Sequence, residues 1–131
     1  MGCDMKNTML RYLLALALLP LSFMAIASDA QQSFKNDVSP IIHDYCLSCH
    51  SPGGKGLEKS GLNMSNYQSL MKGTKFGSVI NPGNSFTSIF IQVIEGRVHA
   101  SIKMPYGMAG GLSKPNILIL KKWVEQGAKN N

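Results

Sequence analysis

The five residues Cys46-Leu47-Ser48-Cys49-His50 have the types and spacing in this chain that are best suited to chemistry. On a helical turn, positions three apart face the same way, so Cys46 and Cys49 can both reach one edge of a porphyrin. Each thiol can form a thioether with a vinyl group there, while His50 places an imidazole nitrogen on the iron. A C-x-x-C-H run is the attachment signature of c-type haem, so the sequence predicts one covalently attached haem.

Three other kinds of site could account for the two cysteines. A thioredoxin-like redox pair would need a βαβ context, which the sequence pattern does not indicate. A zinc site would need a second cysteine or histidine pair at a usable spacing, and none follows. A structural disulfide across so short a gap is rare outside redox sites. Haem therefore fits the pair better than any of the three.

The first part of the chain has the pattern of an export signal. Arg11 precedes an apolar run, residues 12–27, which ends in Ala25-Ile26-Ala27. A charged start, a short apolar core and a small-x-small end are typical of a secretory signal. We predict a cleaved signal peptide at residues 1–27, starting from Met1 or Met5, and a periplasmic location. The alternative is an uncleaved anchor, but the run is shorter than the ~20 residues that a membrane span needs.

Residues 28–131 are expected to form one domain, which folds as a monomer. Within this range the only cysteines are Cys46 and Cys49, so covalent haem attachment leaves no thiol over in an oxidising compartment. The whole chain carries 13 Lys and Arg against 7 Asp and Glu. This excess predicts redox donor and acceptor proteins with acidic docking surfaces, or association with an anionic membrane surface. Nucleic acid is not expected as a partner, since no basic cluster is interleaved with aromatic residues.

Hydrophobic periodicity and capping residues predict a small all-α domain with long loops. The first helical region covers residues 33–49 and restarts at Pro40 with Ser39 as its cap; a loop, residues 51–56, follows. Later helices are expected from Ser65 to Gly73, from Ser85 to Gly96 and from Ser113 to Gly127. The expected apolar faces are Phe34, Val38, Ile41 and Ile42, then Ile89, Phe90, Val93 and Ile94, and finally Ile117, Leu120, Trp123 and Val124. Met64 and Met71 are expected to fill the core.

The sixth ligand of the iron decides between electron transfer and ligand binding. Met104 is the first candidate, because it lies in a glycine-rich stretch before Pro105, which favours an extended backbone at Met104. A thioether is a soft, neutral ligand that favours ferrous iron and raises the reduction potential. Met108, four residues on, and His99 are the alternatives, and an open site is a third. His43 is expected to be an ordinary exposed or core histidine.

With these residues placed, the chain resembles class I c-type cytochromes, and more closely the cytochrome c-like domains found in planctomycete proteins and as small exported proteins. The resemblance covers nearly all of residues 34–128. Besides the C-x-x-C-H run, it rests on Val38-Ser39-Pro40-Ile41-Ile42, Ser60-Gly61-Leu62-Asn63-Met64, Gly77-Ser78-Val79-Ile80-Asn81-Pro82-Gly83, Ser88-Ile89-Phe90, Met104-Pro105, Leu112-Ser113, Leu120 and Trp123-Val124-Glu125-Gln126-Gly127-Ala128. The sequence departs from the common pattern at residues 106–111, where the second methionine stands.

The resemblance implies a helical fold around one covalent haem, with His50 proximal and Met104 distal. It also implies that the N- and C-terminal helices cross, which would bring Phe34 near Trp123. Such domains usually carry single electrons, so we expect an electron carrier rather than an enzyme. Two rival functions stay open: a gas-binding or sensor protein with a displaceable sixth ligand, and the electron-accepting subunit of one dehydrogenase or oxidase.

Overall fold

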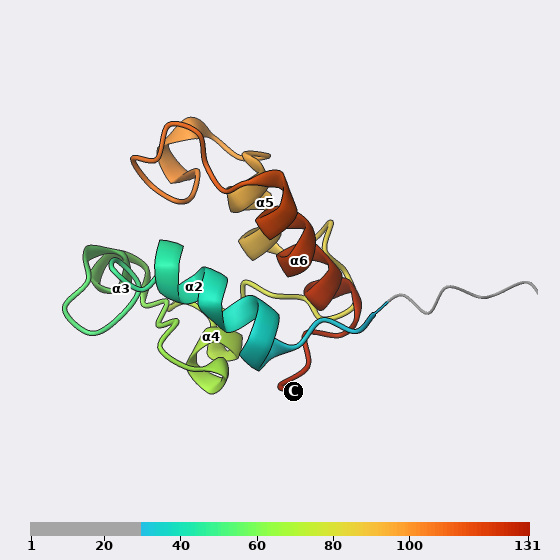
Figure 1. Cartoon of the computed structure of the whole chain (residues 1–131). Coiled ribbons are helices and arrows are strands. Elements are labelled where there is room, and N and C mark those ends of the chain that lie inside the picture. Colours follow the sequence, from blue (N-terminus) through green and yellow to red (C-terminus); the bar gives the residue numbers. More distant parts are fainter. Residues whose placement is uncertain (1–29) are drawn as a thin grey trace, which may run out of the picture.

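The computed structural model describes residues 30–131 as a small helical domain (Figure 1). The predicted signal peptide, residues 1–27, lies outside these residues. No strand occurs in the described part of the chain, which confirms the all-α prediction. Within the same range, no helix is long and apolar enough to cross a bilayer. The elements are the π-helical turn η1 (Phe34–Val38), α2 (Ser39–Tyr45), α3 (Lys55–Ser60), α4 (Tyr67–Lys72), α5 (Ile89–Glu95), the 3₁₀ turn η2 (Ala100–Ile102) and α6 (Lys114–Glu125).

The first helical region begins at Ser33 and runs without a break from η1 into α2. The Ser33 side chain accepts the Asn36 N–H at 3.2 Å and so caps the first turn. The prediction that Ser39 caps a restarted helix is wrong, since Ser39 itself has helical angles of φ −58° and ψ −40°. Pro40 is tolerated because it lies in the first turn of α2, where few backbone N–H groups have intrahelical partners.

Two helices begin later than the sequence predicts. For α4 the cap is Asn66 rather than Ser65, because the Asn66 side chain accepts the Ser69 N–H at 2.9 Å. For α5 the residue before the helix is Ser88 rather than Ser85. The predicted ends are confirmed: α4 stops at Gly73 and α5 at Gly96, whose left-handed φ of 71° suits a glycine.

The later start of α5 changes which of its side chains are buried. The expected apolar face included Ile89, but this side chain is 48% exposed, while Ile91 is fully buried. Phe90 and Ile94 are buried as expected, and Val93 is half-buried. Ile89 is the first residue of the helix and does not belong to its second turn. The side chains that point into the core are therefore those of residues that follow it.

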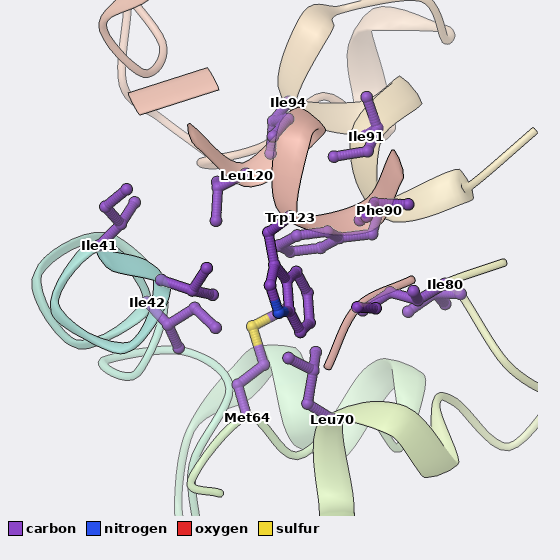
Figure 2. Packing of buried hydrophobic residues seen from close by; sticks show 14 of the residues in the cluster. Ile41, Ile42, Met64, Leu70, Ile80, Phe90, Ile91, Ile94, Leu120 and Trp123 are labelled. Carbon is purple, nitrogen blue, oxygen red and sulfur yellow. The ribbon is translucent and has the colours of Figure 1, made fainter. Parts of the chain in front are cut away.

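Helix α6 brings Trp123 into the centre of the core. Figure 2 shows Trp123 between Ile42 of α2, Leu70 of α4 and Phe90 of α5. The Trp123 ring is 5.6 Å from the Phe34 ring, centroid to centroid, so the first and last helices meet as the resemblance implies. Burying an aromatic side chain of this size contributes strongly to core stability. Both predicted methionine core fillers are confirmed: Met64 is buried, and Met71 packs against the core.

The end of α6 and the following residues are tied to the start of the domain. The Asn131 side chain accepts the Phe34 N–H at 2.9 Å, and the Asn131 carbonyl accepts the Lys35 N–H at 3.0 Å. These are N–H groups of the first helical turn, which have no intrahelical partner. The Gln126 side chain also accepts the Gln32 N–H at 2.7 Å. Residues from the two ends of the described domain therefore complete one another's hydrogen bonds.

A buried serine holds the turn that precedes α5. The Ser88 hydroxyl is only 1% exposed; it accepts the Asn81 N–H at 2.9 Å and donates to the Asn84 carbonyl at 2.8 Å. The same turn is attached to α6, since the Gly83 N–H donates to the Val124 carbonyl at 2.8 Å. Ser88 is thus a structural polar group whose partners all lie in the backbone of one turn.

Replacing Ser88 with alanine is expected to lower the free energy of unfolding by about 1–2 kcal/mol, because the mutation leaves backbone groups of the turn without their partner. Chemical denaturation would measure the change. The neighbouring variant Thr87→Ala is the matched control, because the Thr87 hydroxyl accepts only an exposed amide hydrogen bond, from Asn81. Equal losses for the two variants would contradict the role assigned to Ser88.

Candidate haem site

The backbone of the C-x-x-C-H run continues the coil of α2 by about one turn. The Cys46 N–H donates to the Ile42 carbonyl at 2.9 Å, as it would in a helix. The Cys49 and His50 N–H groups then both donate to the Cys46 carbonyl, at 3.2 and 2.9 Å. Cys46 is half-buried and packs against the core, whereas Cys49 is exposed. This helical turn therefore places two free thiols one turn apart at the end of α2.

The pKa of Cys46 distinguishes this cysteine pair from a thiol redox centre. Burial, and next the neighbouring Cys49 thiol, raise the pKa of Cys46 to about 11. Attacking cysteines of redox C-x-x-C motifs have pKa values lowered well below the ordinary 8.5, since the thiolate is the nucleophile. At neutral pH Cys46 is a neutral, half-buried thiol, which disfavours thioredoxin-like chemistry.

His50 is buried and its orientation is fixed by one hydrogen bond. The side chain is 8% exposed, and its Nδ1 lies 3.2 Å from the Leu62 carbonyl oxygen. A carbonyl can only accept, so Nδ1 is the donor in this hydrogen bond, and Nε2 is the nitrogen left to face a metal. Within residues 30–131, Nε2 has no hydrogen-bond partner. A backbone carbonyl on one imidazole nitrogen is the arrangement that fixes tautomer and ring orientation in metal-ligating histidines.

The segment that follows the motif packs closely against His50 and Cys49. The Leu57 N–H donates to the Cys49 carbonyl at 2.9 Å, and the Met64 N–H donates to the His50 carbonyl at 2.8 Å. At Gly56, in the first turn of α3, an added Cβ would lie 2.8 Å from the His50 Cε1 and 2.9 Å from its Nε2. Only a residue without a side chain fits there. The backbone at Gly56 therefore lies close against the His50 ring, and a side chain there would displace the ring or the backbone.

The three candidates for the sixth ligand have different surroundings. Met104 is half-buried and packs against the core, and its N–H donates to the Val93 carbonyl at 3.0 Å. Met108 is 40% exposed and lines a hollow of about 400 Å³ in its own loop. His99 is exposed, and its Nδ1 lies 2.8 Å from the Ser101 hydroxyl in the turn that it caps. Only Met104 combines burial with a backbone attachment to a helix of the core.

The loop that carries Met104 and the cysteine motif lie toward the same side of the molecule. In Figure 1 the orange loop, residues 100–111, is above the C-terminal end of α2 and above α3. The Met104–Pro105 peptide bond in this loop is cis. That the His50 nitrogen and the Met104 sulfur face each other stays a prediction. His43 is on the outer side of α2, 75% exposed and 3.0 Å from Asp44, as expected for an ordinary histidine.

The residues present fit a covalent haem. A haem of this kind needs two thiols one helical turn apart and an imidazole with one nitrogen not already hydrogen-bonded, and the described residues supply both. The hydrogen bond that orients His50 supports this fit independently of the spacing in the sequence. Cys46, Cys49 and His50 would hold the group, and Met104 is the best placed of the candidates for the second axial position.

Two contributors to the site were not predicted from the sequence. Helix α3 was expected to be a loop up to Gly56, yet the helix begins at Lys55. A glycine within a few residues of a ligand histidine was the available signal for close packing. The Leu62 carbonyl left no signal, because the hydrogen bond to His50 uses a backbone atom that every residue has.

Comparison with known proteins agrees with this site. Residues 46–105 match the model of a family described as Planctomycete cytochrome C. The matched segment begins at Cys46 and ends at Pro105, so it contains the whole C-x-x-C-H run and Met104. No curated protein matches the chain, and no solved structure does. Together with the helical fold, the match supports a cytochrome c-like domain in this part of the chain.

Proposed function

We propose that the chain is an exported monohaem c-type cytochrome that carries single electrons. The observation that carries this proposal is His50, which directly follows the cysteine pair, is buried, and has its Nδ1 fixed by the Leu62 carbonyl. A cytochrome c-like domain implies electron transfer rather than catalysis, and haem c with iron as the cofactor. When bound, the haem supplies a reversible one-electron change at its iron.

The residues of the chain would divide the work of holding and tuning the cofactor. Cys46 and Cys49 anchor it through thioethers, so that the cofactor does not dissociate. His50 is the proximal ligand, held in one tautomer by its hydrogen bond to Leu62. Met104 is the distal ligand, and its half-buried position against the core supports that assignment over the exposed Met108 and His99. Methionine–histidine ligation raises the reduction potential.

The proposal also covers the cellular compartment of the chain and its redox partners. The signal pattern of residues 1–27 supports a periplasmic location, where c-type haem is attached to exported chains. An excess of basic side chains supports redox donors and acceptors with acidic docking surfaces. We propose that the domain works as a monomer that meets these partners transiently, since electron-transfer encounters typically bury little surface.

The direct test is to express the chain with a haem-maturation system. The expected result is a haem-stained band on a denaturing gel and a reversible difference between the oxidised and reduced absorption spectra. The control is the double variant Cys46→Ala/Cys49→Ala, which should give no stained band. A wild-type chain without covalent haem under these conditions would refute the proposal.

A second candidate, gas binding at a displaceable sixth ligand, is favoured by one observation. The loop that follows Met104 carries the exposed Met108 and surrounds a hollow of about 400 Å³. Carbon monoxide distinguishes the two functions. Rapid and tight binding to the ferrous protein at neutral pH would favour the gas-binding function, whereas an electron carrier with Met104 bound should react slowly and weakly.

A further inference from the structure

The structure contains a second hollow, next to the residues that hold His50 in place. It has a volume of about 390 Å³ and is lined by α3, α4 and the segments that follow them. The lining side chains that matter here are Leu57, Asn63, Ser69, Lys72, Thr74 and Lys75. None of the four predicted haem residues lines it. The hollow is thus a separate feature, for which the proposed haem site gives no explanation.

The hollow offers hydrogen-bond donors that have no partner among the described residues. The hydroxyls of Ser69 and Thr74 already donate to oxygens of their own turns, and the Asn63 Oδ1 accepts the Ser65 N–H at 2.9 Å. Among the described residues, the donors of this hollow that lack a partner are the amide NH₂ of Asn63 and the ammonium groups of the two lysines. Such a set is complementary to a carboxylate, which offers only acceptors.

Lys72 and Lys75 are both exposed and uncompensated. Neither forms an ion pair or a side-chain hydrogen bond within residues 30–131, whereas Arg97 and Lys121 both pair with Glu95. The two positive charges therefore keep their full field for a partner of opposite charge. Lysines at the rim of an interface act mainly by steering and orienting such a partner.

An exposed aromatic ring stands next to these charges. Phe76 is 85% exposed, the largest exposure among the large apolar side chains described. The Lys75 ammonium lies 5.3 Å from the centre of its ring, within the range of a cation–π contact. Aromatic residues are enriched at protein–protein interfaces compared with the rest of the surface. A hollow of free donors beside an exposed ring fits a protein segment better than a small inorganic anion.

We propose that this hollow, together with Phe76, is the docking site for an acidic segment of a partner protein, rich in Asp and Glu. Carboxylates of the segment would bind Lys72, Lys75 and the Asn63 amide, while an apolar side chain beside them covers Phe76. The identification of that partner as a redox protein rests on the proposed function; the docking itself does not.

The position of the hollow gives this docking a link to the haem site. Asn63 lines the hollow and directly follows Leu62, whose carbonyl holds the His50 Nδ1. Leu57 also lines it, and its N–H donates to the Cys49 carbonyl. A partner seated in the hollow therefore contacts the segment that supports the proximal histidine.

The test uses the full ferrous holoprotein and a short oligo-glutamate peptide as the probe. Amide chemical shifts measured by NMR at increasing peptide concentration report where the peptide binds. We expect shifts confined to residues 57–76, and weaker binding at higher salt because the contacts are electrostatic. In the variant Lys72→Glu/Lys75→Glu the affinity should fall about tenfold or more.

The matched control is Lys114→Glu/Lys129→Glu, which changes the net charge equally at two exposed lysines outside the hollow and should alter the affinity less than about twofold. If both double variants lose affinity equally, the peptide senses only overall charge and the docking site is wrong. It is also wrong if inorganic phosphate shifts the same amides with the affinity of the peptide. Should the reversed charges perturb the fold, Lys72→Gln/Lys75→Gln replaces that variant with the same expectation.

The same samples separate this inference from the proposed function. Haem content is read from the absorption spectrum before peptide is added. A protein without haem refutes the proposed function, whatever the peptide does. A protein with haem that gives no shifts at residues 57–76 refutes the docking site alone.

Discussion

Replacing Met104 with alanine is expected to lower the reduction potential of the holoprotein by on the order of 0.1 V or more, within the roughly 0.8 V that axial ligands span. The thioether favours ferrous iron, so its loss favours the ferric state. The ferric absorption spectrum should change as well, because the iron loses a ligand. Spectroelectrochemical titration measures both effects in one experiment.

The matched control is Met108→Ala in the same loop. Met108 is 40% exposed and lines a hollow of its own loop, while Met104 packs against the core and is attached to Val93. We therefore expect Met108→Ala to leave the potential and the ferric spectrum close to those of the wild type. The reverse pattern would assign the ligand to Met108, and no effect of either variant would leave His99 or an open site.

Replacing Gly56 with alanine is expected to disturb both stability and ligation. Two effects oppose each other, because alanine favours a helix over glycine by about 1 kcal/mol, and Gly56 lies within α3. Against this, the new Cβ would lie 2.8 Å from the Cys49 carbonyl oxygen and 2.9 Å from the His50 Nε2. Contacts this short force the backbone or the imidazole to move, and overpacking typically costs about 1–3 kcal/mol. The steric effect should win.

Denaturant unfolding of the holoprotein measures the loss in stability, and the absorption spectrum reports the displaced His50. Gly110→Ala is the control, because an added Cβ there meets nothing within 4 Å. This control should behave like the wild type. A Gly56→Ala protein that is more stable than the wild type, with an unchanged spectrum, would show that the close approach of Gly56 to His50 is not needed.

The parts of the molecule that carry a side-chain signature were predictable from the sequence. The cysteine–histidine motif depends on residue types, and Ser113 is the predicted cap of α6, where its hydroxyl accepts the Asn116 N–H. The α5 boundary was missed because Ser85 and Ser88 are both good caps, and the choice depends on tertiary contacts. Ser85 instead donates to the Glu125 side chain at 2.6 Å, a partner 40 positions away that no local pattern reveals.

The contacts that hold His50 in place could not be predicted from sequence patterns. Its acceptor is the backbone carbonyl of Leu62, and its steric limit is the missing side chain of Gly56. A backbone carbonyl and a glycine occur in ordinary loops as well as in binding sites. Only the fold brings these two near His50. The segment that contains them, including α3, reads as glycine-rich loop because short helices gain most of their stability from packing.

The attachment of Asn131 to the first helical turn has a consequence for the order of folding and haem attachment. These hydrogen bonds join residues 97 and 98 positions apart, and Trp123 reaches the first helix only when α6 is present. A helix as short as α2 is not stable by itself. Until α6 and Asn131 are in place, the segment with Cys46 and Cys49 is therefore open. If haem is attached at this stage, the attachment apparatus would meet an unfolded substrate, and docking of α6 and Asn131 would then close the domain around the cofactor.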